Sequence, residues 1–151
     1  MDDVGHSLAF LRTQGPAPVW FVGHSAGATS VANAASRLRT GGPEGIVLIS
    51  SKNGKHDKAS ANLDGVNIED IMVPTLVVHH EEDACEYTLF RNTPQLMRRL
   101  KNSVRSELIS FKGGGPVEGD SCGSSHYHGF PGIEADVASR IVDWIKTVAR
   151  K

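Results

Sequence analysis

The sequence predicts an α/β protein in which a mostly parallel sheet of about four strands has helices on both faces. Four short apolar runs, rich in Val, Ile and Leu, alternate with segments of helical periodicity. Unbroken apolar strands between helices are typical of parallel sheets that are buried on both faces. A chain of 151 residues is long enough for one such core, so we expect residues 1–151 to form a single domain.

The first predicted helix and the first predicted strand lie in the opening 22 residues. Residues 2–14 have one apolar helical face, formed by Val4, Leu8 and Leu11. The apolar run 18–22 has the length and composition of a buried strand. We therefore expect a helix, a Gly-Pro break and the first core strand.

A second helix and a second strand follow. Residues 26–39 have their small and apolar side chains at helical spacing, and a Gly-Gly-Pro sequence ends the pattern. The expected inner face of this helix is Ala28, Val31, Ala35 and Leu38. Residues 46–49 form the second predicted strand, residues 52–67 are polar enough for a loop, and a helical turn is expected near 68–71.

The third and fourth predicted strands are residues 75–79 and 107–111. Between them, Thr93 is expected to cap a helix that has Pro94 at its first position and continues to about residue 102. A glycine-rich loop at 113–132 then precedes the last predicted helix, 133–149. The apolar face of that helix is Ile133, Val137, Ile141, Ile145 and Val148.

Charge and composition exclude several classes of function. The formal net charge of −1 gives no reason to expect binding to nucleic acid or to an anionic membrane. No apolar run approaches the roughly 20 residues of a membrane span. Residues 1–6 have neither the basic nor the apolar region of a signal peptide, so we expect a cytoplasmic protein, or a periplasmic or secreted one if the sequence is a fragment. No spacing of His and Cys resembles H-E-x-x-H or a Cys/His zinc set, and we expect neither a metal nor a cofactor.

Residues 23–27, Gly-His-Ser-Ala-Gly, are the most informative motif in the chain. They lie between an apolar strand and a helix, which is the context of a G-x-S-x-G nucleophile elbow. In this turn the Ser25 hydroxyl points into the open, and Gly23 and Gly27 are expected to let strand and helix approach closely. The N–H of Ala26, at the start of the helix, is expected to receive a negatively charged oxygen.

Further polar side chains follow the third and fourth predicted strands. Residues 79–83 are His-His-Glu-Glu-Asp, and His126 and His128 lie in the loop after the fourth strand. Ligands of a parallel sheet bind beyond the carboxyl ends of its strands, so these side chains are expected to converge with Ser25. The order Ser, acid, His is that of one of the hydrolase folds with a catalytic triad.

Taken together, these motifs resemble the carboxyl-terminal half of an α/β-hydrolase, with the strands of the amino-terminal half absent, as in a truncated or minimal version of the fold. Residues 77–83 resemble the family's strand and H-G-x-x-D-type acid turn, and residues 128–130, His-Gly-Phe, resemble its catalytic histidine. The resemblance implies Ser25 as nucleophile, Asp83 as acid and His128 as base.

The residues alone leave alternatives open for two of these roles. Glu81 and Glu82 compete with Asp83 for the role of acid. His126 competes with His128, because side chains two residues apart in an extended segment point the same way.

The resemblance implies a serine esterase that takes a small ester substrate, with His24 lining the pocket. The segment between Ser51 and Pro74 is short and polar and has no amphipathic lid, so we expect an open site and short acyl chains. The family's segment for a second oxyanion donor is missing. A non-catalytic binding or assembly domain with a relic triad is therefore the alternative function.

The two cysteines and the first strand support further expectations. A related subset of hydrolases has cysteines at the places of Cys85 and Cys122, and this resemblance implies a disulfide between the acid loop and the histidine loop. The strand at 18–22 would be a bare edge of the sheet, with unpaired backbone groups and apolar side chains. We therefore expect a homodimer or a larger homo-oligomer that covers this edge.

Overall fold

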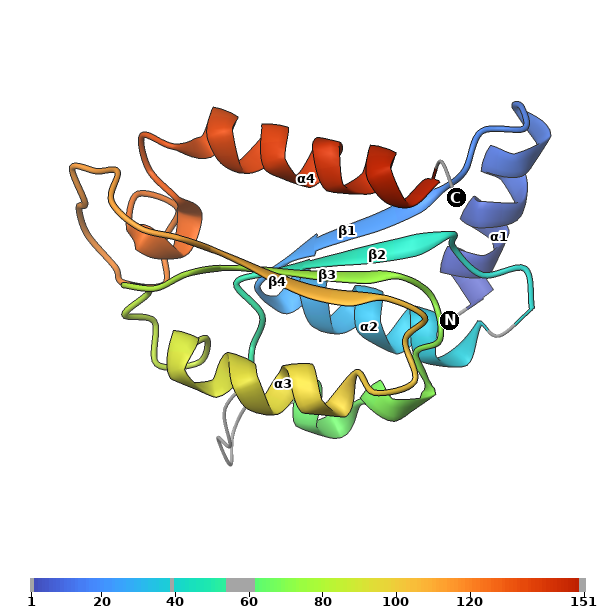
Figure 1. Cartoon of the computed structure of the whole chain (residues 1–151), viewed down its shortest axis with the longest axis horizontal. Coiled ribbons are helices and arrows are strands. Elements are labelled where there is room, and N and C mark those ends of the chain that lie inside the picture. Colours follow the sequence, from blue (N-terminus) through green and yellow to red (C-terminus); the bar gives the residue numbers. More distant parts are fainter. Residues whose placement is uncertain (1, 39, 54–61, 150–151) are drawn as a thin grey trace.

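The computed structural model describes residues 2–38, 40–53 and 62–149, and it shows a parallel sheet between two layers of helices (Figure 1). The strands lie in the order of the chain: β1 (Trp20–His24), β2 (Gly45–Ile49), β3 (Thr75–His80) and β4 (Ser106–Phe111). The helices are α1 (Asp2–Thr13), α2 (Ala26–Arg37), α3 (Thr93–Arg99) and α4 (Glu134–Ala149). The predicted fold class, α/β with a four-stranded parallel sheet, is confirmed.

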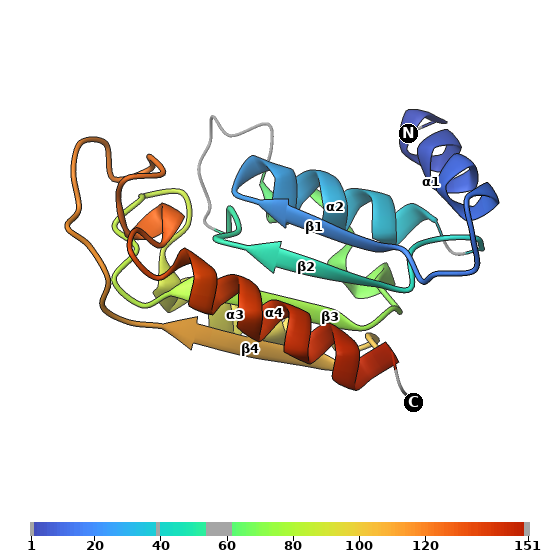
Figure 2. The ribbon, with the colours of Figure 1, turned by 90° about the horizontal axis from the view of Figure 1, so that it is seen from above.

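The two faces of the sheet are covered by different helices (Figure 2). Side chains alternate along each strand, so Ile46 and Leu48 of β2 pack with α2 and with the segment around α3, whereas Val47 packs with α4. The residues of α4 in the second cluster are Val137, Ile141, Trp144, Ile145 and Val148. Both faces are thus buried, as the continuous apolar strands predict.

Helix α1 departs from its prediction. Only Leu8 is buried, with 2% of its surface exposed, whereas Val4 and Leu11 are 39% and 48% exposed. The predicted apolar face of this helix is therefore wrong for two of its three residues. The physical reason is position: α1 lies beside the start of β1, at the edge of the sheet, so that only part of its apolar face is covered (Figure 2).

Several element boundaries also differ from the prediction. Strand β1 begins at Trp20 and continues through His24, because it pairs with β2 up to the nucleophile turn. Helix α3 begins with Thr93 itself, Asn92 occupies the N-cap position without a side-chain hydrogen bond, and the helix ends at Arg99. Within the described residues, no helix is both long and apolar enough to cross a membrane.

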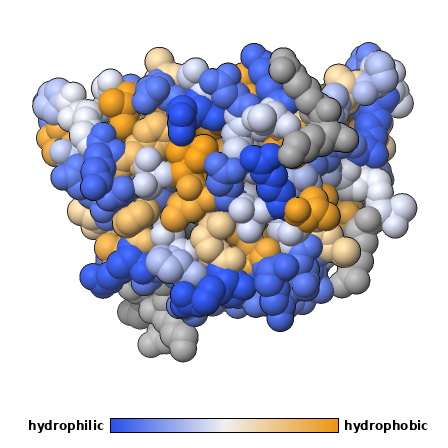
Figure 3. Space-filling view, viewed as in Figure 1, coloured by the Kyte–Doolittle hydropathy of each residue, from blue (hydrophilic) through white to orange (hydrophobic). Residues whose placement is uncertain are grey.

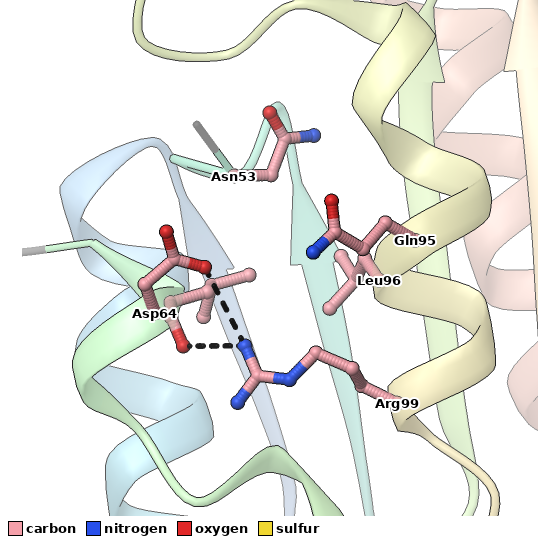
Figure 4. A pocket seen from close by; sticks show the side chains of 6 residues that line it. Asn53, Asp64, Gln95, Leu96 and Arg99 are labelled. Atoms are coloured by element: carbon pink, nitrogen blue, oxygen red, sulfur yellow. Dashed lines mark hydrogen bonds and ion pairs between the residues drawn. The ribbon is translucent and has the colours of Figure 1, made fainter. Parts of the chain in front are cut away.

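The segment before β3 is held by one arginine of α3 (Figure 4). The short 3-10 helix η2 (Ile68–Asp70) confirms the predicted turn near 68–71. A second one, η1 (Leu63–Gly65), lies within the predicted loop, of which residues 54–61 are outside the described residues. Arg99 donates hydrogen bonds to the backbone oxygens of Leu63 and Val66 and to the Glu69 carboxylate. A water-sized cavity of about 10 Å³ lies beside Arg99, and Asn53 and Gln95 are among the residues that line it (Figure 4).

The other edge of the sheet is β4, which lies toward the viewer in Figure 1. The same view in Figure 3 shows hydrophobic residues near the middle of this face, in the region that β4 crosses, and hydrophilic residues along its margins. Most residues of β4 are half-buried, in contrast to the fully buried β3. Both edge strands of the described sheet are therefore partly open to solvent.

Candidate active site

Ser25 occupies a strained turn between β1 and α2. Its backbone φ of 55° and ψ of −117° lie in a region that residues other than glycine rarely adopt. The turn is fixed from both sides: the Ser25 N–H donates to Ile49 O at 2.9 Å, and Ser25 O accepts from the Ala28 N–H at 3.1 Å. Strain that is held in this way is typical of functional sites, and it places a half-buried serine at the carboxyl end of the sheet.

The two glycines of the motif have different roles. A Cβ atom on Gly23 would lie 2.4 Å from Gly27 O, so only glycine fits where the strand approaches the helix. A Cβ atom on Gly27 would meet nothing within 4 Å, so the expectation that Gly27 is needed for close approach is wrong. Ala26, the proposed oxyanion donor, is the first residue of α2 and is exposed.

Asp83 and His128 meet at the same edge of the sheet. Asp83 follows β3, and His128 lies in the 3-10 helix η4 (Tyr127–Gly129) after β4. His128 Nδ1 is 3.0 Å from Asp83 Oδ2, and the two residues are 2% and 5% exposed. The other carboxylate oxygen, Oδ1, accepts the Cys85 N–H at 3.0 Å. The structure therefore brings together two of the three predicted triad residues in a buried contact.

Hydrogen bonding around this pair fixes the state of both groups. Burial by itself raises the pKa of Asp83, but hydrogen bonds from His128, the Cys85 N–H and Thr88 outweigh burial and hold that pKa below its usual value. An ionised carboxylate only accepts hydrogen bonds, so the proton on His128 is at Nδ1. The other ring nitrogen, Nε2, is then left with the lone pair that a general base needs.

The histidine loop is attached to the nucleophile turn through its backbone. The carbonyl oxygen of His128 accepts hydrogen bonds from the Ser50 hydroxyl at 3.0 Å and from His24 Nε2 at 2.9 Å. The rings of His24 and His128 have centroids 4.7 Å apart, and His24 is the direct neighbour of Ser25. His24, which is expected to line the pocket, is thus exposed and engaged with the histidine loop.

No hydrogen bond between the Ser25 hydroxyl and the His128 ring occurs in the described part of the chain. Such bonds are often long in enzymes without substrate and shorten when substrate binds.

The rival acids and the rival histidine lie elsewhere. The Glu81 carboxylate accepts from the Ser110 hydroxyl and pairs with Lys112, and the Glu82 carboxylate faces the Gly113 N–H. The His126 ring lies against Tyr127, and its Nδ1 is buried without a hydrogen-bond partner in the described residues. Among the described residues, neither Glu81 nor Glu82 has a recorded contact with the His126 or His128 ring, whereas Asp83 is 3.0 Å from His128 Nδ1.

The two residues after His128, Gly129 and Phe130, are required by the local packing of the histidine loop. A Cβ atom on Gly129 would lie 2.2 Å from Ser124 O, so only glycine fits at this position. Phe130 has a left-handed backbone with a φ of 62°, and its buried ring packs against Phe111 and His80. The contacts of Gly129 and Phe130 thus fix the position of η4, the 3-10 helix that carries His128.

Sequence reasoning missed Thr88, which contacts both members of the pair, and it assigned no catalytic role to His79. The Thr88 hydroxyl donates to Asp83 Oδ2 at 2.8 Å and lies 3.1 Å from His128 Nδ1. His79, which lies near the end of β3, donates from Nε2 to Thr88 O and lies 3.5 Å from Asp83 Oδ2. Burial lowers the pKa of His79. No sequence pattern distinguishes Thr88 from any other threonine in a loop.

A disulfide joins the acid loop to the histidine loop through Cys85 and Cys122. Cys85 is buried and its N–H is the donor to Asp83 Oδ1, so the covalent link begins two residues after the acid, at a residue that hydrogen-bonds to it. In the described residues, no group of three or more His, Cys, Asp or Glu side chains is arranged to hold a metal ion.

Comparison with solved structures shows the fold. The chain is similar to an α/β-hydrolase enzyme from a Medee basin deep-sea metagenome, at a TM-score of 0.68 and 21% identity over 99% of this chain and 64% of that one. A protein described as a dienelactone hydrolase from Klebsiella pneumoniae matches at a TM-score of 0.64 and 16% identity, over 99% of this chain and 60% of that one.

An esterase domain from Rhodothermus marinus matches at a TM-score of 0.54 and 18% identity, over 74% of this chain and 57% of that one. No protein-family model and no curated protein matches the sequence. The chain therefore has an α/β-hydrolase-like fold and spans less than two thirds of the length of these solved structures, as the resemblance to one half of the fold predicts.

Proposed function

We propose that this chain is a serine hydrolase that cleaves short-chain carboxylic esters through Ser25, His128 and Asp83. The observation that carries the proposal is the buried contact between His128 Nδ1 and Asp83 Oδ2, in a loop that His24 links to the serine turn. A carboxylate in this place selects the Nδ1–H tautomer and stabilises the imidazolium that forms during proton transfer. The hydrolase-like fold of the solved neighbours supports the same class of reaction.

The reaction follows from these roles. His128 Nε2 takes the proton of the Ser25 hydroxyl as the serine oxygen attacks the acyl carbon. The N–H of Ala26 stabilises the negative oxygen of the tetrahedral intermediate, and His128 returns the proton to the leaving alcohol. Water then attacks the acyl-enzyme with the same base.

Hydrolysis of p-nitrophenyl acetate, butyrate and octanoate by the purified chain tests the proposal. We expect the acetate and butyrate esters to react faster than the octanoate, because the sequence between Ser51 and Pro74 is too short and polar for an amphipathic lid. Ser25→Ala should abolish turnover, and Ser30→Ala, which removes an exposed hydroxyl from the same helix, should leave it unchanged. A preference for octanoate would contradict the open site. No turnover of any ester would favour the non-catalytic binding domain.

A further inference from the structure

We propose that Thr88 is a positioning residue that holds Asp83 and His128 in their productive arrangement. This inference rests on the proposed function and extends it to a residue outside the triad. Thr88 has no exposed surface, and its hydroxyl contacts both members of the pair: Asp83 Oδ2 at 2.8 Å and His128 Nδ1 at 3.1 Å. A hydroxyl is both a donor and an acceptor, so one group satisfies both contacts.

The direction of each hydrogen bond follows from the chemistry of the partners. The ionised Asp83 has no proton to give, so the Thr88 hydroxyl donates to it. The hydroxyl oxygen then has only lone pairs left, and it faces His128 Nδ1 as a second acceptor beside the carboxylate. Both acceptors require a proton on Nδ1, which keeps the lone pair on Nε2.

The loop that carries Thr88 is closed by its own hydrogen bonds. The Cys85 N–H donates to Asp83 Oδ1, Cys85 O accepts from the Thr88 N–H at 3.0 Å, and the Thr88 hydroxyl returns to Asp83 Oδ2. His79, which is fully buried at the end of β3, holds the carbonyl oxygen of Thr88 from the other side. Thr88 is therefore fixed by its N–H, its carbonyl and its hydroxyl, and the carboxylate cannot rotate without breaking this ring.

A matched pair of substitutions tests the role in catalysis. Thr88→Val replaces the hydroxyl by a methyl group of similar size and removes a hydrogen bond to a charged group, so kcat for p-nitrophenyl acetate should fall about 10- to 100-fold with KM nearly unchanged. Thr88→Ser keeps the hydroxyl and should retain most of kcat. Thr93→Val is the control, because the Thr93 hydroxyl is buried without a hydrogen-bond partner in the described residues, and it should leave kcat unchanged.

Proton NMR provides a readout that does not depend on activity. In the wild-type chain the His128 Nδ1–H should give a downfield signal with a cross-peak to a slowly exchanging Thr88 hydroxyl proton. The signal should persist in Thr93→Val and broaden or shift in Thr88→Val.

A rapidly exchanging Thr88 hydroxyl in the wild type would overturn the proposal even if Thr88→Val does not fold. An unchanged His128 Nδ1–H signal in Thr88→Val would also overturn it. If the wild type is active, an unchanged kcat in Thr88→Val would overturn it as well. Failure of the wild type to hydrolyse any ester would instead contradict the proposed function and leave the NMR result to decide the role of Thr88.

Discussion

His128 Nδ1 lies 3.0 Å from Asp83 Oδ2, although the two residues are 45 positions apart in the sequence. Parallel strands explain this contact, because β3 and β4 pair in register up to His80 and Phe111 and end at the same edge. The loops that continue from these two strand ends carry the acid and the histidine. The disulfide between Cys85 and Cys122 then links the same two loops covalently.

His128→Ala should reduce ester hydrolysis about 10⁴-fold or more, because the chain then lacks the base that activates the serine. His126→Ala is the matched control: the same residue type two positions earlier, with its ring against Tyr127 and away from Asp83. It should keep most of the activity. Initial rates with p-nitrophenyl butyrate measure both variants, and a larger loss in His126→Ala would reverse the assignment of the base.

The free energy of unfolding should decrease in acid because of two buried groups. Burial lowers the pKa of His79 in the folded chain, so below the ordinary histidine value of about 6.5 the unfolded chain binds a proton that the folded chain excludes. This loss begins as the pH falls through that value and continues down to the lowered pKa. Burial by itself raises the pKa of Asp83, but its hydrogen bonds outweigh burial and lower that pKa in the folded chain. The ionised Asp83 therefore contributes to the free energy of unfolding above the ordinary aspartate pKa of about 3.9. This contribution is lost as the pH falls from that value through the lowered pKa.

Urea unfolding at several pH values measures this dependence. His79→Gln should flatten the decrease that begins below about pH 6.5, since the titrating group is gone. His6→Gln changes an exposed histidine of α1 and should preserve the decrease. An equal slope in wild type and His79→Gln would show that His79 is not the group responsible.

The disulfide should stabilise the chain by restricting its unfolded state. Cys85 and Cys122 are separated by 37 positions, and closing a ring of this size corresponds to about 4 kcal/mol at most. The double variant Cys85→Ala/Cys122→Ala should therefore unfold at lower urea concentration. The wild type with dithiothreitol should behave in the same way. If reductant leaves the midpoint of unfolding unchanged, the disulfide either does not form or does not stabilise the chain.

Strand β1 is an edge of the described sheet, and this leads us to expect a homodimer or a larger homo-oligomer. Val22 is 53% exposed on this strand, and an apolar groove of about 280 Å³ lies beside it. The groove is lined by Val4, Trp20, Phe21, Val22, Ser30, Val31 and Ala34. A second copy related by a two-fold axis would pair β1 with β1 and cover the same groove on both chains.

Light scattering during size-exclusion chromatography tests this expectation. Val22→Lys should shift the mass toward the monomer, since it places a charge at the centre of the proposed interface. Val142→Lys is the control, because Val142 is similarly exposed, at 45%, on α4 and away from β1. A wild-type chain that is monomeric at micromolar concentration would contradict the dimer.

The sequence predicts those parts of the fold and of the candidate site that depend on local pattern. The strands and the Ser25 turn follow from apolar runs and glycines near the turn, and Asp83 and His128 follow from their motifs. The exposure of Val4 and Leu11 could not be predicted, because it depends on what lies beside the sheet edge. The role of Thr88 could not be predicted either, because it depends on contacts between two loops that no local pattern encodes.

Covalent labelling of the purified chain by a fluorophosphonate, located by peptide mass spectrometry, tests the central claim most directly. Only an activated serine reacts readily with this probe, so we expect one adduct, on Ser25, that is absent in Ser25→Ala and much slower to form in His128→Ala. Ser30→Ala should label as the wild type does. A folded wild-type chain that takes up no label, or a Ser25→Ala variant that is labelled equally, would contradict the assignment of Ser25 as an activated nucleophile.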